Sequence, residues 1–248
     1  SMFVDLTNAV NADIADEQGE GRIADSGNNG DIPTLTISNS TVVEGDFNIF
    51  TVQISNPSTE NIKFDFSTDD ITATKLEDYN PDLIDVYEVS NDNGITWTQA
   101  TSATITAGNT AILVRVPTID DTTSETDETY NLIATITEGT TTNTDYQTGS
   151  EVIGVGTIID NDGAPSILIG DAVLDEQNGE MVFKVSLSNK SSSEVTVTFK
   201  TEDDTAEAGK DYTSTIGIVI FPIGSDVEYI RVPINDDKIF ENRHREHE

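Results

Sequence analysis

The chain has 248 residues and a formal net charge of −34, from 46 acidic and 12 basic residues. Nucleic acids and anionic membrane surfaces are bound through positive charge, so this balance argues against both as partners. Cations, in contrast, would relieve the repulsion within a compact fold. The sequence has no cysteine and no apolar run long enough for a membrane helix, so we expect neither disulfides nor direct membrane insertion.

Helix signals are almost absent from the sequence. Short segments rich in Val, Ile, Thr and Phe instead recur between clusters of Gly, Asn, Asp and Ser, as strands do between turns. Such spacing favours an all-β chain of antiparallel sandwiches over an up-and-down barrel. The predicted strands span residues 34–38, 49–55, 62–67, 110–117, 130–137 and 152–159.

The chain also repeats itself, which indicates tandem modules. The matching segments are FTVQISNP (50–57) with FKVSLSNK (183–190), FSTDDITATKLEDY (66–79) with FKTEDDTAEAGKDY (199–212), and LVRVPTIDD (113–121) with YIRVPINDD (229–237). The first two pairs are 133 residues apart (183 − 50) and the third pair is 116 apart (229 − 113). The first copy therefore carries 17 extra residues (133 − 116) between Tyr79 and Leu113.

A third trace of the repeat lies at the amino end. GEGRIAD (19–25) is similar to GVGTIID (154–160), and FVDLTN (3–8) has the pattern of the strand before it, with Val4, Leu6, Ile14 and Ile23 as candidate inward residues. This predicts three parts: the last two strands of a preceding module and a linker (1–31), a complete module with an inserted hairpin at about 80–103 (32–163), and a module without its final strands (164–248).

The insertion contains SNDNGITW (90–97), which fits the Asp-box pattern S-x-D-x-G-x-T-W. We expect a hairpin in which Asp92 accepts backbone N–H bonds, Gly94 supplies a positive φ and Trp97 packs beneath. Asp-boxes occur in sialidase propellers, but a propeller needs several copies at regular spacing, and this chain has one. A stabilised hairpin is the better interpretation.

Several segments together resemble the Calx-beta family, which occurs in regulatory domains of sodium–calcium exchangers and as tandem copies in large bacterial adhesins. They are VVEGD, EDY, RVPTIDD, DETY and GTIIDND in the first copy, and VLDEQNGE, KDY and VPINDD in the second. The resemblance covers nearly the whole chain. It implies tandem Greek-key (immunoglobulin-like) β-sandwiches of the Calx-beta type, each of seven strands, with Ca2+ at the loops of one end.

In the resembling exchanger domains, acidic residues at matching places ligate calcium, a cation that takes about six to eight oxygen ligands. Carried over to this chain, the cluster of the complete module is Glu44, Asp78, Asp120, Asp121 and Glu125, joined by Asp160 and Asp162 from the outgoing linker. The last module matches at Glu176, Asp211, Asp236, Asp237 and Glu241, and Asp25 matches Asp160. Two further carboxylates, Asp127 and Glu128, either join the cluster or only face solvent. An acidic loop face without an ion is the alternative for the whole set.

Hydrolytic chemistry has little support in the sequence, so we do not expect an enzyme. His244 and His247 are the only histidines and lie in a charged tail, where an H-x-x-H pair could bind zinc. Asp120 and Asp121 could mimic a glycosidase pair, but adjacent strand residues point to opposite faces.

The insertion and the short GTIIDNDGAPS junction are more similar to repetitive RTX-type surface adhesins than to exchangers. This similarity implies a secreted or cell-surface extender that calcium rigidifies through contacts between neighbouring modules. A calcium sensor, as in exchangers, and a glycan- or ligand-binding sandwich are the alternatives. The cut ends also predict head-to-tail self-association, in which residues 3–25 of one molecule complete the last module of the next and Asp25 lends it a ligand.

Overall fold

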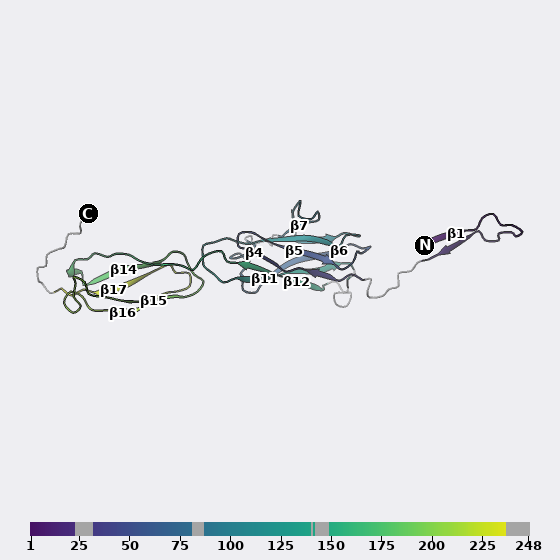
Figure 1. The fold of residues 1–248 in the computed structure, drawn as a ribbon. Coiled ribbons are helices and arrows are strands. Elements are labelled where there is room, and N and C mark those ends of the chain that lie inside the picture. Colours follow the sequence, from purple (N-terminus) through teal and green to yellow (C-terminus); the bar gives the residue numbers. More distant parts are fainter. Residues whose placement is uncertain (23–31, 81–86, 140, 142–148, 237–248) are drawn as a thin grey trace.

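The computed structural model describes residues 1–22, 32–80, 87–139, 141 and 149–236. These residues form strands and one short 3-10 helix, η1 (Glu176–Asn178), and none of them belongs to a helix long and apolar enough to cross a membrane. Figure 1 shows a terminal hairpin (β1–β2), a sandwich of strands β3 to β12, and a second set of strands, β13 to β17. We call the two larger parts the closed sandwich and the open sandwich.

The closed sandwich consists of two five-stranded sheets. Their order in space is β3 (Leu35–Ile37), β5 (Phe47–Ile54), β10 (Ala111–Pro117), β7 (Glu88–Ser90) and β8 (Thr98–Gln99) in one sheet, and β4 (Ser40–Val43), β12 (Glu151–Ile159), β11 (Glu128–Glu138), β6 (Ile62–Asp70) and β9 (Ser102–Ile105) in the other. All six predicted strands are present. Strands β4 and β9 were not predicted, whereas β7 and β8 are the two strands of the hairpin that was predicted in the insertion. The fold class, an all-β sandwich, is confirmed.

The core of the closed sandwich follows from alternation along its strands, whose inward residues are apolar. Phe50, Phe64 and Leu132 are completely buried between the sheets. At one end of the core, Tyr79 stacks on Tyr130 with ring centroids 4.1 Å apart. The ring of Tyr130 lies over Gly156, where a Cβ atom would approach it to 2.6 Å.

The insertion is more than a surface hairpin. Its strand β7 pairs with β10, and Val89 joins Tyr87 in the buried core. The Asp-box turn has the expected geometry: Asp92 accepts the Thr96 N–H at 2.9 Å, and Gly94 has φ 87°. The ring of Trp97 packs against the Arg115 guanidinium, 4.4 Å away, which closes the hairpin over β10.

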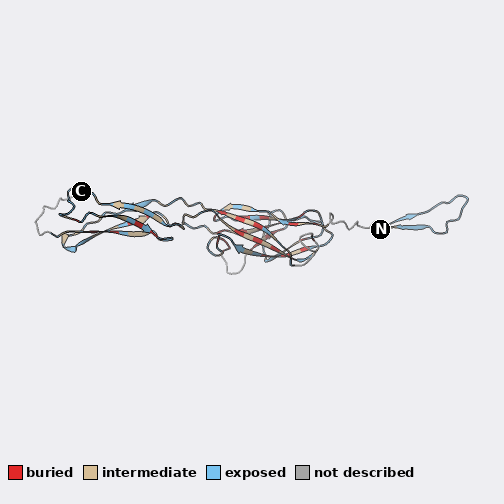
Figure 2. Ribbon diagram, turned by 90° about the horizontal axis from the view of Figure 1, so that it is seen from below, coloured by how far each residue is buried: buried red, intermediate tan, exposed pale blue. Residues whose placement is uncertain are grey.

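In its described part, residues 164–236, the open sandwich has fewer strands and a smaller core than the closed one. One sheet has the order β13 (Ile167–Ile169), β14 (Glu180–Leu187) and β17 (Val227–Pro233), and the other pairs β15 (Val195–Lys200) with β16 (Ile216–Phe221). Figure 2 shows that buried residues are concentrated in the closed sandwich. In the described part of the open sandwich, no strand corresponds to β11 or β12.

The sequence repeat is visible as a repeated turn. In the closed sandwich the Tyr79 hydroxyl donates to Asp70 at 2.5 Å, and the Thr74 N–H donates to Asp78 at 2.6 Å. In the open sandwich the Tyr212 hydroxyl donates to Asp203 at 2.6 Å, and the Glu207 N–H donates to Asp211 at 2.6 Å. The two copies therefore hold Asp78 and Asp211 in the same local structure.

The amino-terminal hairpin pairs β1 (Met2–Asp5) with β2 (Gln18–Gly21) in antiparallel fashion. The predicted inward residues Val4, Leu6 and Ile14 are all exposed in the structure, because none of the described strands packs on the hairpin. Ile23 lies outside the described residues.

Candidate metal centre

The predicted ligands of the closed sandwich converge at one of its ends. Strand β4 runs parallel to β12, so both strands finish there, and the Glu44 N–H donates to the Ile159 carbonyl at 3.1 Å. Asp160 and Asp162 follow β12 directly. The chain after β10, a strand of the other sheet, carries Asp120 and Asp121, and the chain before β11, the antiparallel neighbour of β12, carries Glu125. Segments far apart in sequence thus meet.

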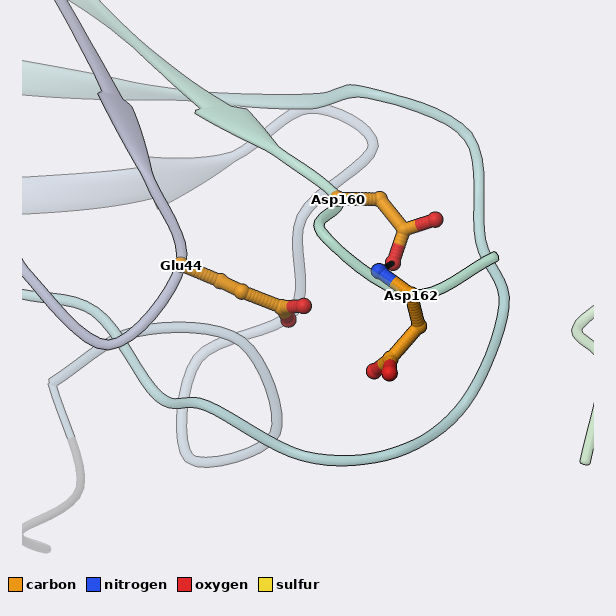
Figure 3. A group of neighbouring side chains, drawn as sticks. All are labelled: Glu44, Asp160 and Asp162. Carbon is orange, nitrogen blue, oxygen red and sulfur yellow. Dashed lines mark hydrogen bonds between the residues drawn. The ribbon is translucent and has the colours of Figure 1, made fainter. Parts of the chain in front are cut away.

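One triad of carboxylates comprises Glu44, Asp160 and Asp162, with one oxygen of each within 4.8 Å of the others. Figure 3 shows the Glu44 side chain extending from the end of β4 toward the loop that carries both aspartates. The loop is held by the Asp162 N–H, which donates to Asp160 at 3.2 Å. Glu44 itself is buried, with 8% of its surface exposed.

A second triad comprises Asp78, Glu125 and Glu128, also within 4.8 Å of one another. The repeated turn fixes Asp78, and the Asp78 carbonyl accepts the Ile119 N–H at 2.8 Å. Glu128 begins β11 and lies on the same face as Tyr130, because strand residues two apart share a face. Its neighbour Asp127 is exposed. Of the two carboxylates that the sequence left open, Glu128 joins the cluster and Asp127 faces solvent.

The two triads belong to one acidic end. The Glu125 N–H donates to Asp160 at 3.1 Å, which joins a residue of the second triad to one of the first. Burial is the main cause of the raised pKa of Glu44, Glu125 and Asp162, and the charge of Asp121 adds to it in all three. Asp120 is tied in through Asn161, whose side-chain amide donates to it at 3.1 Å.

Asn161 is a residue of this site that the sequence reasoning missed. Its backbone N–H donates to Glu44 at 3.1 Å while its amide holds Asp120. It therefore fixes two predicted ligands that follow two different strands, β4 and β10. Its position between Asp160 and Asp162 in the IIDND segment could have pointed to this role, because a short acidic turn needs hydrogen-bond donors to hold its carboxylates in place.

Burial and the crowding of like charges raise the pKa values of the carboxyl groups at this end. Burial and the charges of Asp78, Asp121, Asp160 and Glu44 raise the pKa of Glu125 to about 7. Burial and a hydrogen bond with Asp78 raise the pKa of Glu128 to about 8. The pKa of Glu44 is raised chiefly by burial. Without a cation, the folded protein therefore favours protonated carboxyl groups here.

These residues fit a hard divalent cation. Every donor side chain of the two triads is a carboxylate, the ligand type that calcium prefers. Two of their oxygens, Glu128 Oε2 and Asp162 Oδ2, are buried without a hydrogen-bond partner in the described structure. Buried polar atoms are normally satisfied, so a bound cation would complete this end.

The loop that carries Glu125 also contacts the open sandwich. The Ser124 N–H donates to the Lys190 carbonyl at 3.0 Å, and the Ser192 N–H donates to the Ser124 carbonyl at 3.0 Å. These two bonds form a short bridge between Ser124 and Ser191. The residue next to a predicted ligand is therefore anchored on the neighbouring module.

The matching carboxylates of the open sandwich do not form such a group in the described part of the chain. Glu176 and Asp211 line the same cavity between its sheets, and Asp236 follows β17. Asp25, Asp237 and Glu241 lie outside the described residues, as do His244 and His247. A site here stays a prediction.

Comparison with known proteins identifies the family. The sequence profile of the Calx-beta domain matches residues 28–99, 98–162 and 160–246. Sodium/calcium exchanger 1 of Rattus norvegicus is 57% identical over 47 residues, and that of Mus musculus is 54% identical over 50 residues. Each match spans about a fifth of this chain (19% and 20%) and 5% of the exchanger's length.

Two solved structures are similar at low identity. The calcium binding domain CBD12 of CALX1.1 has 21% identity and a TM-score of 0.38, with 82% of this chain and 76% of that chain covered. The apo-form Calx CBD1 domain has 17% identity and a TM-score of 0.39, with 53% of this chain and all of that chain covered (100%). On the strength of the profile, which extends over both sandwiches, the chain belongs to the Calx-beta domain family.

Proposed function

We propose that the acidic end of the closed sandwich binds calcium, and that this binding stiffens the closed sandwich and its junction with the open one. The observation that carries the proposal is the pair of carboxylate triads, assembled from four separate segments of the chain. The folded chain alone brings these segments together. A cation that binds them stabilises the folded state by RT ln(1 + [Ca]/Kd), about 2.7 kcal/mol at a concentration of 100 Kd.

The residues have distinct roles in this proposal. Glu44, Asp160 and Asp162 would hold one ion, and Asp78, Glu125 and Glu128 a second, with Asp121 close to both. Asn161 positions Glu44 and Asp120. Calcium supplies the positive charge that lets all these carboxylates stay ionised together. By ordering the loop that carries Ser124, it would also fix the hydrogen bond that Ser124 donates to Lys190 and the one that it accepts from Ser192.

A thermal unfolding experiment with and without a calcium chelator tests this assignment. The double variant Glu125→Gln, Glu128→Gln should lose most of the calcium-dependent rise in melting temperature. Asp127→Asn is the matched control, because Asp127 lies between these residues but is exposed. An equal calcium-dependent rise in melting temperature in the parent and the double variant would show that the second triad does not bind calcium.

At the level of the whole protein, we infer an extender segment of a secreted or cell-surface adhesin, in which tandem sandwiches hold a binding domain at a distance. Two features support it: consecutive sandwiches joined by a short linker, and a strongly acidic surface suited to a saline medium. Small-angle scattering should show a stiffer particle with calcium. Ser124→Pro removes the N–H that donates to Lys190, so it should reduce that stiffening while calcium still binds.

A calcium sensor is the second candidate, favoured by the identity with the exchangers over 47 residues. Affinity distinguishes the two. A sensor responds at micromolar calcium or below, whereas an extracellular module is saturated at 10⁻⁴ to 10⁻³ M, on the order of the values for other extracellular calcium modules. The glycan-binding alternative gains no support from Trp97, because its ring packs against Arg115. We propose no enzymatic activity.

A further inference from the structure

One turn of the closed sandwich connects the end of β6 to the predicted ligand Asp78. Its first residue, Asp70, is the last residue of β6. The Asp70 carboxylate accepts two hydrogen bonds through Oδ1, from the Lys75 N–H at 3.1 Å and from the Tyr79 hydroxyl at 2.5 Å. Tyr79 is completely buried, so its hydroxyl needs such a partner. Asp70 therefore ties the middle of the turn to its end.

The turn also fixes Asp78 itself. The Asp78 N–H donates to the Thr74 carbonyl at 2.9 Å, and the Asp78 carboxylate accepts the Thr74 N–H at 2.6 Å through Oδ2. The Asp78 carbonyl accepts the Ile119 N–H at 2.8 Å, from the segment that leads to Asp120. The main chain of Asp78 and one of its carboxylate oxygens are thus held in place by the protein alone.

Leu76 shows that hydrogen bonds hold this turn against strain. Its φ of 75° lies in the left-handed region, where a leucine is strained. The matched residue of the open sandwich is Gly209, with φ 85°, and a glycine adopts this conformation without steric cost. Leu76 is 42% exposed, so burial of its side chain offsets little of the strain. Such strain persists where the surroundings over-determine the backbone, here through the Leu76 N–H, which donates to the Tyr79 carbonyl at 2.9 Å.

Tyr79 links two ligands of the second triad, Asp78 and Glu128. It follows Asp78 in the chain, and its ring stacks on the ring of Tyr130 with centroids 4.1 Å apart. Tyr130 lies two residues after Glu128, on the same face of β11. The separation of the Asp78 and Glu128 carboxylates therefore depends on where the Tyr79 ring lies in this stack. The hydrogen bond to Asp70 fixes the far end of that ring.

We propose that Asp70 and Tyr79 are positioning residues for the second triad. The hydrogen bond between them sets the position of Asp78 relative to Glu128 and thereby the calcium affinity of the triad. This inference rests on the proposed function, because it needs a cation at this triad. Neither Asp70 nor Tyr79 belongs to the two triads, so both act through Asp78. Replacing a residue that orients a metal ligand commonly lowers metal affinity about 10- to 100-fold.

Denaturant unfolding of the full chain at a series of calcium concentrations tests the proposal. A residue that only stabilises the fold changes the free energy of unfolding equally in calcium and in chelator, so the calcium-dependent rise stays the same. A residue that positions a ligand changes the rise as well, because the rise depends on Kd. Tyr79→Phe deletes the hydroxyl, keeps the stacked ring and leaves the net charge unchanged. We expect it to increase the Kd of the closed sandwich about tenfold.

The open sandwich offers a matched control for the hydroxyl. Tyr212→Phe deletes the equivalent hydrogen bond, from Tyr212 to Asp203. The calcium-dependent rise of the closed sandwich should stay as in the parent. A rise that falls as much in Tyr212→Phe as in Tyr79→Phe would contradict a local positioning role.

A second pair of variants separates position from charge. Asp70→Ala should weaken calcium binding at least as much as Tyr79→Phe, because it removes the acceptor of two hydrogen bonds. Asp69→Ala removes the same charge from the neighbouring residue, which is exposed on the opposite face of β6, and should change Kd less than twofold, on the order of a weak surface charge interaction. Asp70→Asn keeps an oxygen acceptor and should recover part of the affinity.

Three results would overturn the proposal. In the first, Tyr79→Phe is less stable in chelator but keeps the calcium-dependent rise of the parent, so that its role is structural alone. In the second, Asp69→Ala weakens binding as much as Asp70→Ala, so that charge and not position sets the affinity. In the third, the parent shows no calcium-dependent rise at all, and the proposed function fails together with this inference.

Discussion

The closed and open sandwiches carry the same repeat and differ in what completes them. Both hold the Tyr–Asp turn with nearly identical hydrogen bonds, around Tyr79 and Tyr212. The closed sandwich adds β11 and β12, which cover its core and bring Glu128 and Asp160 to the acidic end. The described part of the open sandwich has the turn but neither strand. Local turns therefore form without the last two strands, whereas the full core and the carboxylate triads depend on them.

The largest expected difference concerns the cores. Phe66→Ala should destabilise the closed sandwich by about 3–5 kcal/mol, the usual cost of emptying a buried phenylalanine site. Phe66 is 6% exposed and contacts Phe64 and Tyr87, with ring centroids 5.3 and 5.7 Å away. The matched variant Phe199→Ala should cost the open sandwich less than half as much, since Phe199 lines an open groove. Denaturant unfolding followed by calorimetry resolves the two transitions; equal losses would contradict the difference in packing.

Calcium should separate the two sandwiches in the same way. At a calcium concentration of 100 Kd, the transition of the closed sandwich should gain about 2.7 kcal/mol. The open sandwich should respond less, because its described carboxylates do not form a triad. Scanning calorimetry with calcium and with chelator measures both transitions in one sample. A larger calcium-dependent shift in the transition of the open sandwich would show that the main calcium site lies there and not in the closed sandwich.

The pH dependence of the metal-free protein sharpens the comparison further. The folded-state pKa values of Glu125 and Glu128, about 7 and 8, lie above their ordinary value of 4.5. Their contribution to stability is therefore fully present below about pH 4.5 and is lost as the pH rises through 7 to 8. The melting temperature of the closed sandwich should fall across this range in chelator, and Glu128→Gln should flatten the fall. If the melting temperature of Glu128→Gln falls with pH as steeply as that of the parent, the carboxylate of Glu128 does not cause the fall.

The smallest expected difference concerns two matched arginines. Arg115 pairs with Glu88 at 2.5 Å and lies between the rings of Phe47 and Trp97, 4.2 and 4.4 Å away. Arg231 pairs with Glu180 at 2.7 Å on a more exposed surface. Arg115→Gln should cost about 1 kcal/mol, because cation–π contacts add to the ion pair. Arg231→Gln should cost less than about 0.5 kcal/mol, as chemical denaturation of each variant can show.

Much of this fold could be predicted from the sequence, because apolar alternation is a direct consequence of strand geometry. All six strands with clear alternation, such as 130–137, are present. Strands β4 and β9 were missed because they are short, with few apolar inward residues. The contribution of the insertion to the core, through Tyr87 and Val89, depends on pairing with β10, which no local pattern reveals.

The residue types of the candidate site could be predicted from the sequence, but not how their side chains group in space. The family resemblance supplied the carboxylates, and the strand ends place them together. The division into two triads could not be predicted, since it depends on which side chains the packing turns toward one another. Glu128 could have been assigned from its position two residues before the buried Tyr130, on the inward face of β11. Asn161 carries no charge, so the only signal in the sequence was its position between Asp160 and Asp162, and its hydrogen bonds to Glu44 and Asp120 define its role.

Equilibrium dialysis with calcium tests the central claim, that the two triads bind this ion. The parent chain should take up calcium saturably, and the double variant Glu44→Gln, Glu128→Gln, with one change in each triad, should lose most of that uptake. Asp127→Asn should bind as the parent does, although it also removes a negative charge from the same loop. Equal uptake by the parent and the double variant would contradict the account, because calcium would then bind the acidic surface without using the triads.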